Sequence, residues 1–328
     1  MKLATIKNAS RDGRLAVVSH DLSSAVYADR IAPTLLDAVE RWSAVEGALR
    51  VLSNDLNART AENVFQFDPL TAMAPMPRCY QWLDGSAFAN HGALMERAFD
   101  TGTKNDYQQY PLMYQGASDD FLGPRDDIEL PAEKDNMDFE AEIAVIVDEI
   151  SMGTARSKMP AHVKLLVLVN DISLRGLAVR EMKTGFGWIQ AKPTSSFSPV
   201  AITPDELGSH WSSGRVELPL HVTRNDEWFG NPNAKEMTFD FYRLLEHAAY
   251  SRRLRAGTIL GSGTVSNVSR SAGSCCISER RAIEMIDAGE PKTPFMRYGE
   301  RVRIEMMDEA GHSLFGAIDQ RYVKPSPS

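Results

Sequence analysis

The sequence predicts an α+β protein in which a small α/β portion at the N-terminus precedes a larger, strand-rich portion. Lys2–Ile6 and Leu15–Ser19 are apolar segments that flank an Asp-Gly step, which is typical of a hairpin. Residues 34–52 then carry apolar side chains at near-helical spacing. From Ile128 onward, strand-like segments dominate. These observations together give the fold class.

Residues 67–78 separate the two portions. They contain three prolines and show no regular period, as expected of an extended connector. At 328 residues the chain is long enough for one large domain or two ordinary ones. We expect an N-terminal domain with its connector over residues 1–78 and a C-terminal domain over residues 79–328.

The remaining elements are predicted from local patterns. Strands are expected at residues 137–147, 162–169, 215–223, 258–260, 301–306 and 312–317, with a turn at 308–311. Helices are expected in the second half of residues 80–99, at 173–183 and at 239–251.

Composition narrows the class of partner and the compartment. A formal net charge of -8 argues against nucleic acid or an anionic membrane surface as the main partner. Three cysteines, two of them adjacent, are too few for a disulfide framework and favour a reducing compartment. The first residues have no apolar leader core, and no apolar run is long enough to span a bilayer. We therefore expect a cytoplasmic protein.

The segment Met137–Val147 is the first candidate for a functional site, because it places two carboxylates in an otherwise apolar strand. Apolar residues occupy every second position from Phe139, so Glu140 and Glu142 share the opposite face of a half-buried strand, with Cα atoms about 7 Å apart. Two carboxylates this close need a proton, a basic partner or a cation, and Mg²⁺, Mn²⁺ or Ca²⁺ suits oxygen ligands. The alternative is a solvated face of an amphipathic strand.

Two further segments place charged residues near predicted strand ends. Asp171 follows a buried apolar strand, where it either faces a ligand or caps the next helix, and Arg175 lies one helical turn further on. Asp84 and His91 flank a short junction between a loop and a helix. Lys192 lies in a turn rich in Ser and Pro, although a single lysine is ordinarily a surface residue.

Gly261 and Gly263 lie close together in a run that lacks the lysine of a phosphate-binding loop. Close approach of the backbone to a ligand, or a tight turn in a sheet, explains them better.

The sequence from about Tyr80 to the C-terminus resembles the fumarylacetoacetate hydrolase family, both in its short motifs and in the order in which they occur. The shared motifs are an Asp seven positions before a His (Asp84, His91), P-x-x-Y-x-G (Pro111–Gly116), D-x-E-x-E (Asp138–Glu142), N-D-x-S-x-R (Asn170–Arg175), Lys192 before a Ser-Pro turn, and G-S-G-T-x-S (Gly261–Ser266). The resemblance implies a small N-terminal domain followed by a mixed β-roll C-terminal domain, usually in a homodimer.

The resemblance also implies a site and a reaction. Four carboxylates, Asp84, Glu140, Glu142 and Asp171, would bind Mg²⁺ (or Ca²⁺ or Mn²⁺). The substrate would be a small 1,3-diketo acid such as fumarylacetoacetate, an intermediate of aromatic amino-acid catabolism, or a shorter acylpyruvate such as fumarylpyruvate. His91 would take a proton from water, Lys192 and Arg175 would supply positive charge, and Tyr114 and Thr264 would hold substrate oxygens.

Some positions depart from the family pattern. Ala178 replaces an expected Gln, Ser86 replaces a Tyr, and Ile277 stands where a base-orienting Glu is expected, with Glu279 as a candidate replacement. Two rival hypotheses therefore stay open: a decarboxylase or isomerase of related keto acids, and a metal-stabilised binding protein without catalysis. Residues 104–123 are the candidate lid.

Overall fold

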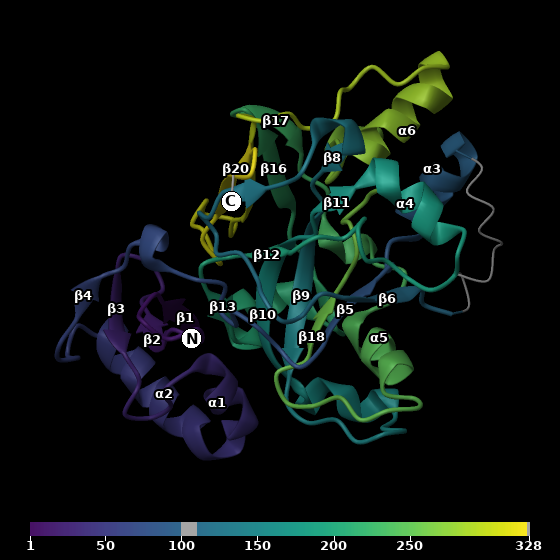
Figure 1. Cartoon of the computed structure of the whole chain (residues 1–328). Helices are drawn as coiled ribbons and strands as arrows, with labels where there is room; N and C mark the ends of the chain where they lie inside the picture. The colour runs from purple at the N-terminus through teal and green to yellow at the C-terminus, as the bar shows by residue number, and fades with distance from the viewer. Residues whose placement is uncertain (100–109, 327–328) are drawn as a thin grey trace.

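The computed structural model describes residues 1–99 and 110–326 (Figure 1). Its largest unit is one mixed sheet that runs through both portions of the chain. In spatial order its strands are β4 (Phe65–Gln66), β3 (Ser24–Tyr27), β2 (Arg14–Val18), β1 (Lys2–Ile6), β13 (Ala201–Ile202), β10 (Val163–Asn170), β9 (Ala141–Val147), β18 (Ile259–Gly261), β5 (Trp82–Gly85) and β6 (Met113–Gly116), with β12 (Ser196–Phe197) paired to β10. The α+β prediction is confirmed.

The N-terminal portion follows its amphipathic pattern. β1 and β2 form the predicted antiparallel hairpin. The single helix expected at 34–52 is instead two helices, α1 (Leu35–Glu40) and α2 (Trp42–Asn57), because Arg41 leaves helical geometry at φ -116° and ψ 27°. Buried side chains of both helices share one apolar core with β1, β2 and β3. This portion joins the rest through antiparallel pairing of β1 with β13.

Strand β9 corrects the expectation of a half-buried strand. All seven of its residues are buried, because apolar clusters cover both of its faces. The predicted strand at 137–147 is also broken in two. Met137–Asp138 form β8, which pairs with β11 (Ser173–Leu174), whereas Glu140 leaves the strand and bridges to Cys276. This break separates the surroundings of Glu140 from those of Glu142.

A second sheet has the order β17 (Glu227–Gly230), β16 (Leu220–Arg224), β19 (Arg301–Met306), β20 (Ile318–Val323) and β7 (Ile128–Glu129). The strand predicted at 215–223 is therefore two pieces, β15 (Arg215–Val216) and β16. The strand predicted at 312–317 is wrong, because that segment only returns the chain from the turn at 308–311 and β20 begins at Ile318.

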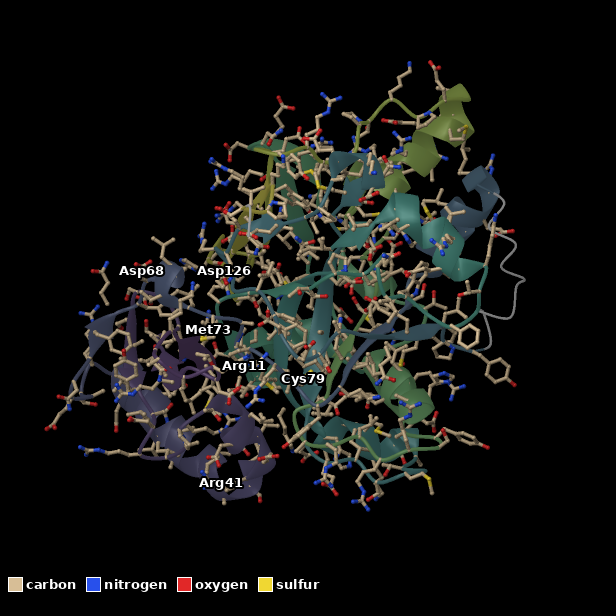
Figure 2. All side chains as sticks on the ribbon, in the orientation of Figure 1. Arg11, Arg41, Asp68, Met73, Cys79 and Asp126 are labelled. Atoms are coloured by element: carbon tan, nitrogen blue, oxygen red, sulfur yellow. The ribbon has the colours of Figure 1, made fainter. Side chains whose placement is uncertain are left out.

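The α-helices in the described part of the C-terminal portion are α3 (Ala89–Phe99), α4 (Arg175–Met182), α5 (Phe241–Ala248) and α6 (Ile277–Ala288). The first three confirm the predicted helices, with α4 and α5 shorter than expected, whereas α6 was not predicted. Figure 1 shows α3, α4 and α6 together on one side of the molecule, and α3 contacts α6. In the part of the chain described, no helix has both the length and the apolar character needed to cross a membrane. The three cysteines are free thiols, and Figure 2 labels Cys79 near the junction of the two portions.

Candidate metal centre and active site

Three buried carboxylates meet where neighbouring strands of the large sheet end. Asp84 lies on β5, Glu142 on β9, and Asp171 directly after β10, and these strands follow one another in the sheet with β18 between β9 and β5. An oxygen from each carboxylate lies within 4.8 Å of the others. The sheet order therefore brings together acidic residues that are far apart in the sequence.

Burial and mutual repulsion disfavour ionisation of this trio. Burial, together with the nearby charge of Asp171, raises the pKa of Asp84 to about 8. Burial and the charges of Asp84 and Asp171 raise the pKa of Glu142 well above its usual range. Burial likewise raises the pKa of Asp171, although Lys192 opposes the shift. The three groups therefore need protons or a cation to be stable together.

Two glycines make room for Asp84. A Cβ atom on Gly261, which pairs with Asp84 between β18 and β5, would lie 2.3 Å from Asp84 Oδ1. Gly263 has φ +73°, and a Cβ atom there would lie 2.3 Å from the carbonyl oxygen of Gly85. The Gly263 amide donates to Asp84 Oδ1 over 3.1 Å. The glycine-rich run thus serves close backbone packing around a site carboxylate.

Glu140, the fourth carboxylate, has a different environment. Its Oε1 accepts from Arg175 Nη2 at 2.6 Å, and its Oε2 accepts from Lys192 Nζ, which also donates to Asp171. Burial alone would raise its pKa, but Arg175 and Lys192 hold the pKa of Glu140 well below its usual range. Glu140 is therefore an ionised carboxylate held between two cationic side chains.

His91 lies on α3 and faces α6. Its Nδ1 is 2.8 Å from Glu279 Oε2, and Glu279 is 1% exposed. An ionised carboxylate only accepts hydrogen bonds, so this contact favours the tautomer with its proton on Nδ1, and in that neutral tautomer Nε2 is an acceptor. His91 also has a ring nitrogen within 4.8 Å of Glu140 and of Cys276. Glu279, the candidate replacement for the missing family Glu, therefore lies against the imidazole.

Two hydroxyl groups hold Asp171. Tyr114, which is paired with Asp84 between β6 and β5, donates to Asp171 Oδ2 over 2.6 Å. Burial and the charge of Asp171 keep the pKa of Tyr114 well above its usual range, so the phenol stays a donor. Ser195 donates to Asp171 Oδ1 over 2.9 Å. The position of Tyr114 fits an orienting role, and its substrate-binding role stays a prediction.

The donor set of the trio suits a hard divalent cation. Neither carboxylate oxygen of Glu142 receives a hydrogen bond from an N–H group or a hydroxyl among the described residues, and both are buried. The Asp84 carboxyl can bond Glu142, but only when a proton lies between the two groups. Unpaired buried oxygens of this kind are rare unless an ion or ordered water satisfies them. Carboxylate oxygens are the ligands that Mg²⁺, Ca²⁺ and Mn²⁺ prefer. We conclude that Asp84, Glu142 and Asp171 fit such an ion.

Most of the predicted site residues lie in this region. Asp84, Glu142 and Asp171 form the trio, and Glu140, Lys192, Arg175 and Tyr114 are joined to it or to one another by hydrogen bonds. Thr264 is buried three residues beyond β18, and its role stays a prediction. Ser195 and Asp138 were missed, although both lie inside motifs that the sequence singled out. Of the candidate lid, residues 104–109 lie outside the described part of the chain.

The positions that depart from the family pattern lie close to these elements. Ser86 follows β5 directly, and its amide donates to the carbonyl of Leu112 over 2.9 Å. Ala178 is 9% exposed on α4, the helix that begins with Arg175. Neither position disturbs the trio or the pair of His91 and Glu279.

The sequence matches two models of known protein domains. Residues 81–321 match the model of the fumarylacetoacetate (FAA) hydrolase C-terminal domain, and residues 1–78 match fumarylacetoacetase N-terminal domain 2. The chain is similar to a 2,4-didehydro-3-deoxy-L-rhamnonate hydrolase of Sphingomonas sp. (strain SKA58), with 28% identity over 47% of this chain and 52% of that protein. It is also similar to the mitochondrial oxaloacetate tautomerase Fahd2a of Rattus norvegicus, with 26% identity over 47% of this chain and 48% of that protein.

The fold has close counterparts among solved structures. One is the maleylpyruvate hydrolase of Sphingobium sp. SYK-6 in complex with manganese(II) ion and pyruvate, with a TM-score of 0.66 and 16% identity over 99% of this chain and 100% of that one. At this identity the likeness shows the fold alone. The matched region spans about half the length of the two curated relatives. Because the family model covers most of its length, the chain belongs to the fumarylacetoacetate hydrolase family.

Proposed function

We propose that this protein is a divalent-metal-dependent hydrolase that cleaves a carbon-carbon bond in small 1,3-diketo acids. Fumarylacetoacetate is the first substrate to test, and fumarylpyruvate or another acylpyruvate is the next. The observation that carries the proposal is the buried trio of Asp84, Glu142 and Asp171 in the same region as a His91 imidazole held by Glu279. A cytoplasmic homodimer is part of the same proposal.

Each residue has a role that its contacts support. Asp84, Glu142 and Asp171 would hold the ion. When bound, that ion supplies Lewis-acid chemistry that favours negative charge on an enolate oxygen. With Nδ1 bonded to Glu279, the free Nε2 of His91 would accept a proton from the attacking water.

The two cations provide fixed positive charge beside the reacting centre. Lys192 bonds Glu140 and Asp171, and although burial opposes it, the charge of Asp171 raises the pKa of Lys192. Lys192 is thus charged at neutral pH and suits stabilisation of a substrate carboxylate or oxyanion rather than proton abstraction. Arg175 is fixed by Asp138 and Glu140 and would contribute positive charge beside Glu140.

A keto acid tautomerase or isomerase is the second candidate. The rat relative named as an oxaloacetate tautomerase favours it, and the same ion-stabilised enolate serves both reactions. The two candidates differ in whether water becomes part of the products, which product analysis by NMR resolves. Fumarate with acetoacetate, or pyruvate with a released acid, indicates hydrolysis. An unchanged carbon skeleton indicates isomerisation, and carbon dioxide indicates decarboxylation.

The test uses purified protein with Mg²⁺ and fumarylacetoacetate, followed by the loss of ultraviolet absorbance of the diketo acid. His91→Ala is expected to abolish turnover and to keep the thermal stabilisation by Mg²⁺, because the trio is intact. His162→Ala is the matched control, since His162 also pairs with a carboxylate, Asp148, at 2.6 Å but lies outside the site. Equal turnover of His91→Ala and wild type would eliminate the proposed base. Metal stabilisation without turnover of any keto acid would favour a binding protein.

A further inference from the structure

Helix α6 lacks an ordinary cap at its N-terminus. Its N-cap residue is Cys276, whose Sγ accepts from the Glu279 amide at 3.3 Å. A thiol is a weak acceptor, and Ser, Thr, Asp and Asn are the side chains that usually cap helices. The first turn of α6 nevertheless carries Glu279, the partner of His91. Something else must therefore fix this turn.

Asp138 on β8 satisfies the donors that Cys276 leaves free. Its Oδ1 accepts from the Ile277 amide at 2.8 Å, and its Oδ2 accepts from the Ser278 amide at 3.0 Å. These are the first two residues of α6, and Asp138 is 0% exposed. A buried carboxylate at a helix N-terminus is also favoured by the helix dipole. Asp138 thus caps α6 from a different element.

The Asp138 carboxylate also binds Arg175, one of the two cationic side chains of the site. Asp138 Oδ2 accepts from Arg175 Nε at 2.9 Å, and Arg175 Nη2 donates to Glu140 at 2.6 Å. The backbone of Asp138 is fixed as well, by pairing of β8 with Ser173 and by the Tyr322 hydroxyl, which donates to its carbonyl over 3.2 Å. The Asp138 side chain therefore contacts both the first turn of α6, which carries Glu279, and the guanidinium of Arg175.

We propose that Asp138 is a positioning residue that locks the His91–Glu279 pair and the Arg175–Glu140 pair into one arrangement. The inference rests on the proposed function for its kinetic test, but the positioning itself can be measured without turnover. Asp138 does not need to touch substrate or metal. Its effect passes through the first turn of α6 on one side and through the guanidinium on the other.

The test compares Asp138→Asn with Asp240→Asn. Asp240 is a matched control: it is 4% exposed, caps α5 through the Arg243 amide at 3.0 Å, and bonds Arg156 at 2.6 Å, and none of these partners is a residue assigned to the site. Both variants lose a buried, charged cap and are expected to melt at similarly lowered temperatures. Only Asp138→Asn is expected to lower kcat, by about 10- to 100-fold, because an amide cannot accept all three hydrogen bonds. KM is expected to change by much less.

The second measurement is the NMR signal of the His91 Nδ1 proton, identified by its absence in His91→Ala. We expect this signal in wild type and in Asp240→Asn, and its loss or displacement in Asp138→Asn. An unchanged signal together with a kcat within twofold of wild type would overturn the proposal. A kcat loss of equal size in both variants would also overturn it, since it would reflect folding alone. If wild type hydrolyses no diketo acid, the proposed function fails, while the NMR comparison still decides the positioning role.

If Asp138→Asn does not fold, the double variant with Cys276→Ser decides. A serine hydroxyl at the N-cap restores a strong acceptor for α6. Recovery of soluble protein with the His91 Nδ1 signal supports capping as the route by which Asp138 acts. Failure to recover either one overturns it.

Discussion

Asp84→Asn should stabilise the metal-free protein and destabilise the metal-bound one. The change removes a carboxyl group that is forced close to Asp171 and Glu142 in a buried site. Asn keeps the side-chain oxygen that accepts from the Gly263 amide at 3.1 Å, so the local geometry has a reason to persist. The sign of the effect therefore depends on whether a cation is present.

The magnitude follows from the pKa of Asp84, which burial and Asp171 raise from 3.8 to about 8. An acid with a raised pKa binds more protons in the folded state, so the free energy of unfolding falls as pH rises from about 4 to about 8. At pH 7 the penalty is on the order of 4 kcal/mol, or about 1.4 kcal/mol for each pH unit. An unsatisfied amide hydrogen offsets about 2 kcal/mol of this gain.

The assay is chemical denaturation of wild type and Asp84→Asn at pH 5 and pH 7, in chelator and in excess Mg²⁺. In chelator we expect the variant to be about 2 kcal/mol more stable than wild type at pH 7. We expect this advantage to disappear at pH 5, because the penalty for ionising Asp84 is then only about 2 kcal/mol and the unsatisfied amide offsets it. With Mg²⁺ at about a hundred times its dissociation constant, wild type should gain about 2.7 kcal/mol, and the variant much less.

Asp319→Asn is the control for loss of a buried carboxylate. Asp319 bonds Arg125 at 2.6 Å and also pairs with Arg301, so its removal should destabilise the protein equally in chelator and in Mg²⁺. If Asp84→Asn behaves like Asp319→Asn, losing stability without regard to Mg²⁺, then the trio is not a cation site and the electrostatic reasoning is refuted.

Three further results are expected. Gly261→Ala should remove the thermal stabilisation by Mg²⁺, because its Cβ would lie 2.3 Å from Asp84 Oδ1; an unchanged metal-dependent shift would contradict this. Glu279→Gln should lower kcat but leave Mg²⁺ stabilisation intact, since it alters only the partner of His91, and loss of metal binding would show a different role. Burial lowers the pKa of Lys2 to about 8, so its charge costs about 3 kcal/mol below that pH; stability should rise with pH between about 8 and 10.5, and Lys2→Met should flatten this rise in denaturation curves.

The amino-acid sequence by itself determined the local elements and the chemical inventory of the site. Alternating apolar residues with an Asp-Gly step predicted the first hairpin, and helical spacing predicted α3, α4 and α5. The resemblance to the fumarylacetoacetate hydrolase family, carried by short ordered motifs, singled out the acidic residues, His91 and Lys192. These features are local, because each depends on residues within one element or one motif.

Only the tertiary structure decided how these residues are paired. Glu140 and Glu142 are two positions apart, yet the strand is interrupted between β8 and β9, and Glu140 lies in the interruption. Glu140 therefore bonds cationic side chains, whereas Glu142 joins the trio. Full burial of β9 depends on cores from distant segments on both of its faces. The cap of α6 by Asp138 joins residues about 140 positions apart, a contact that no local pattern encodes because its partners meet only when the sheets are assembled.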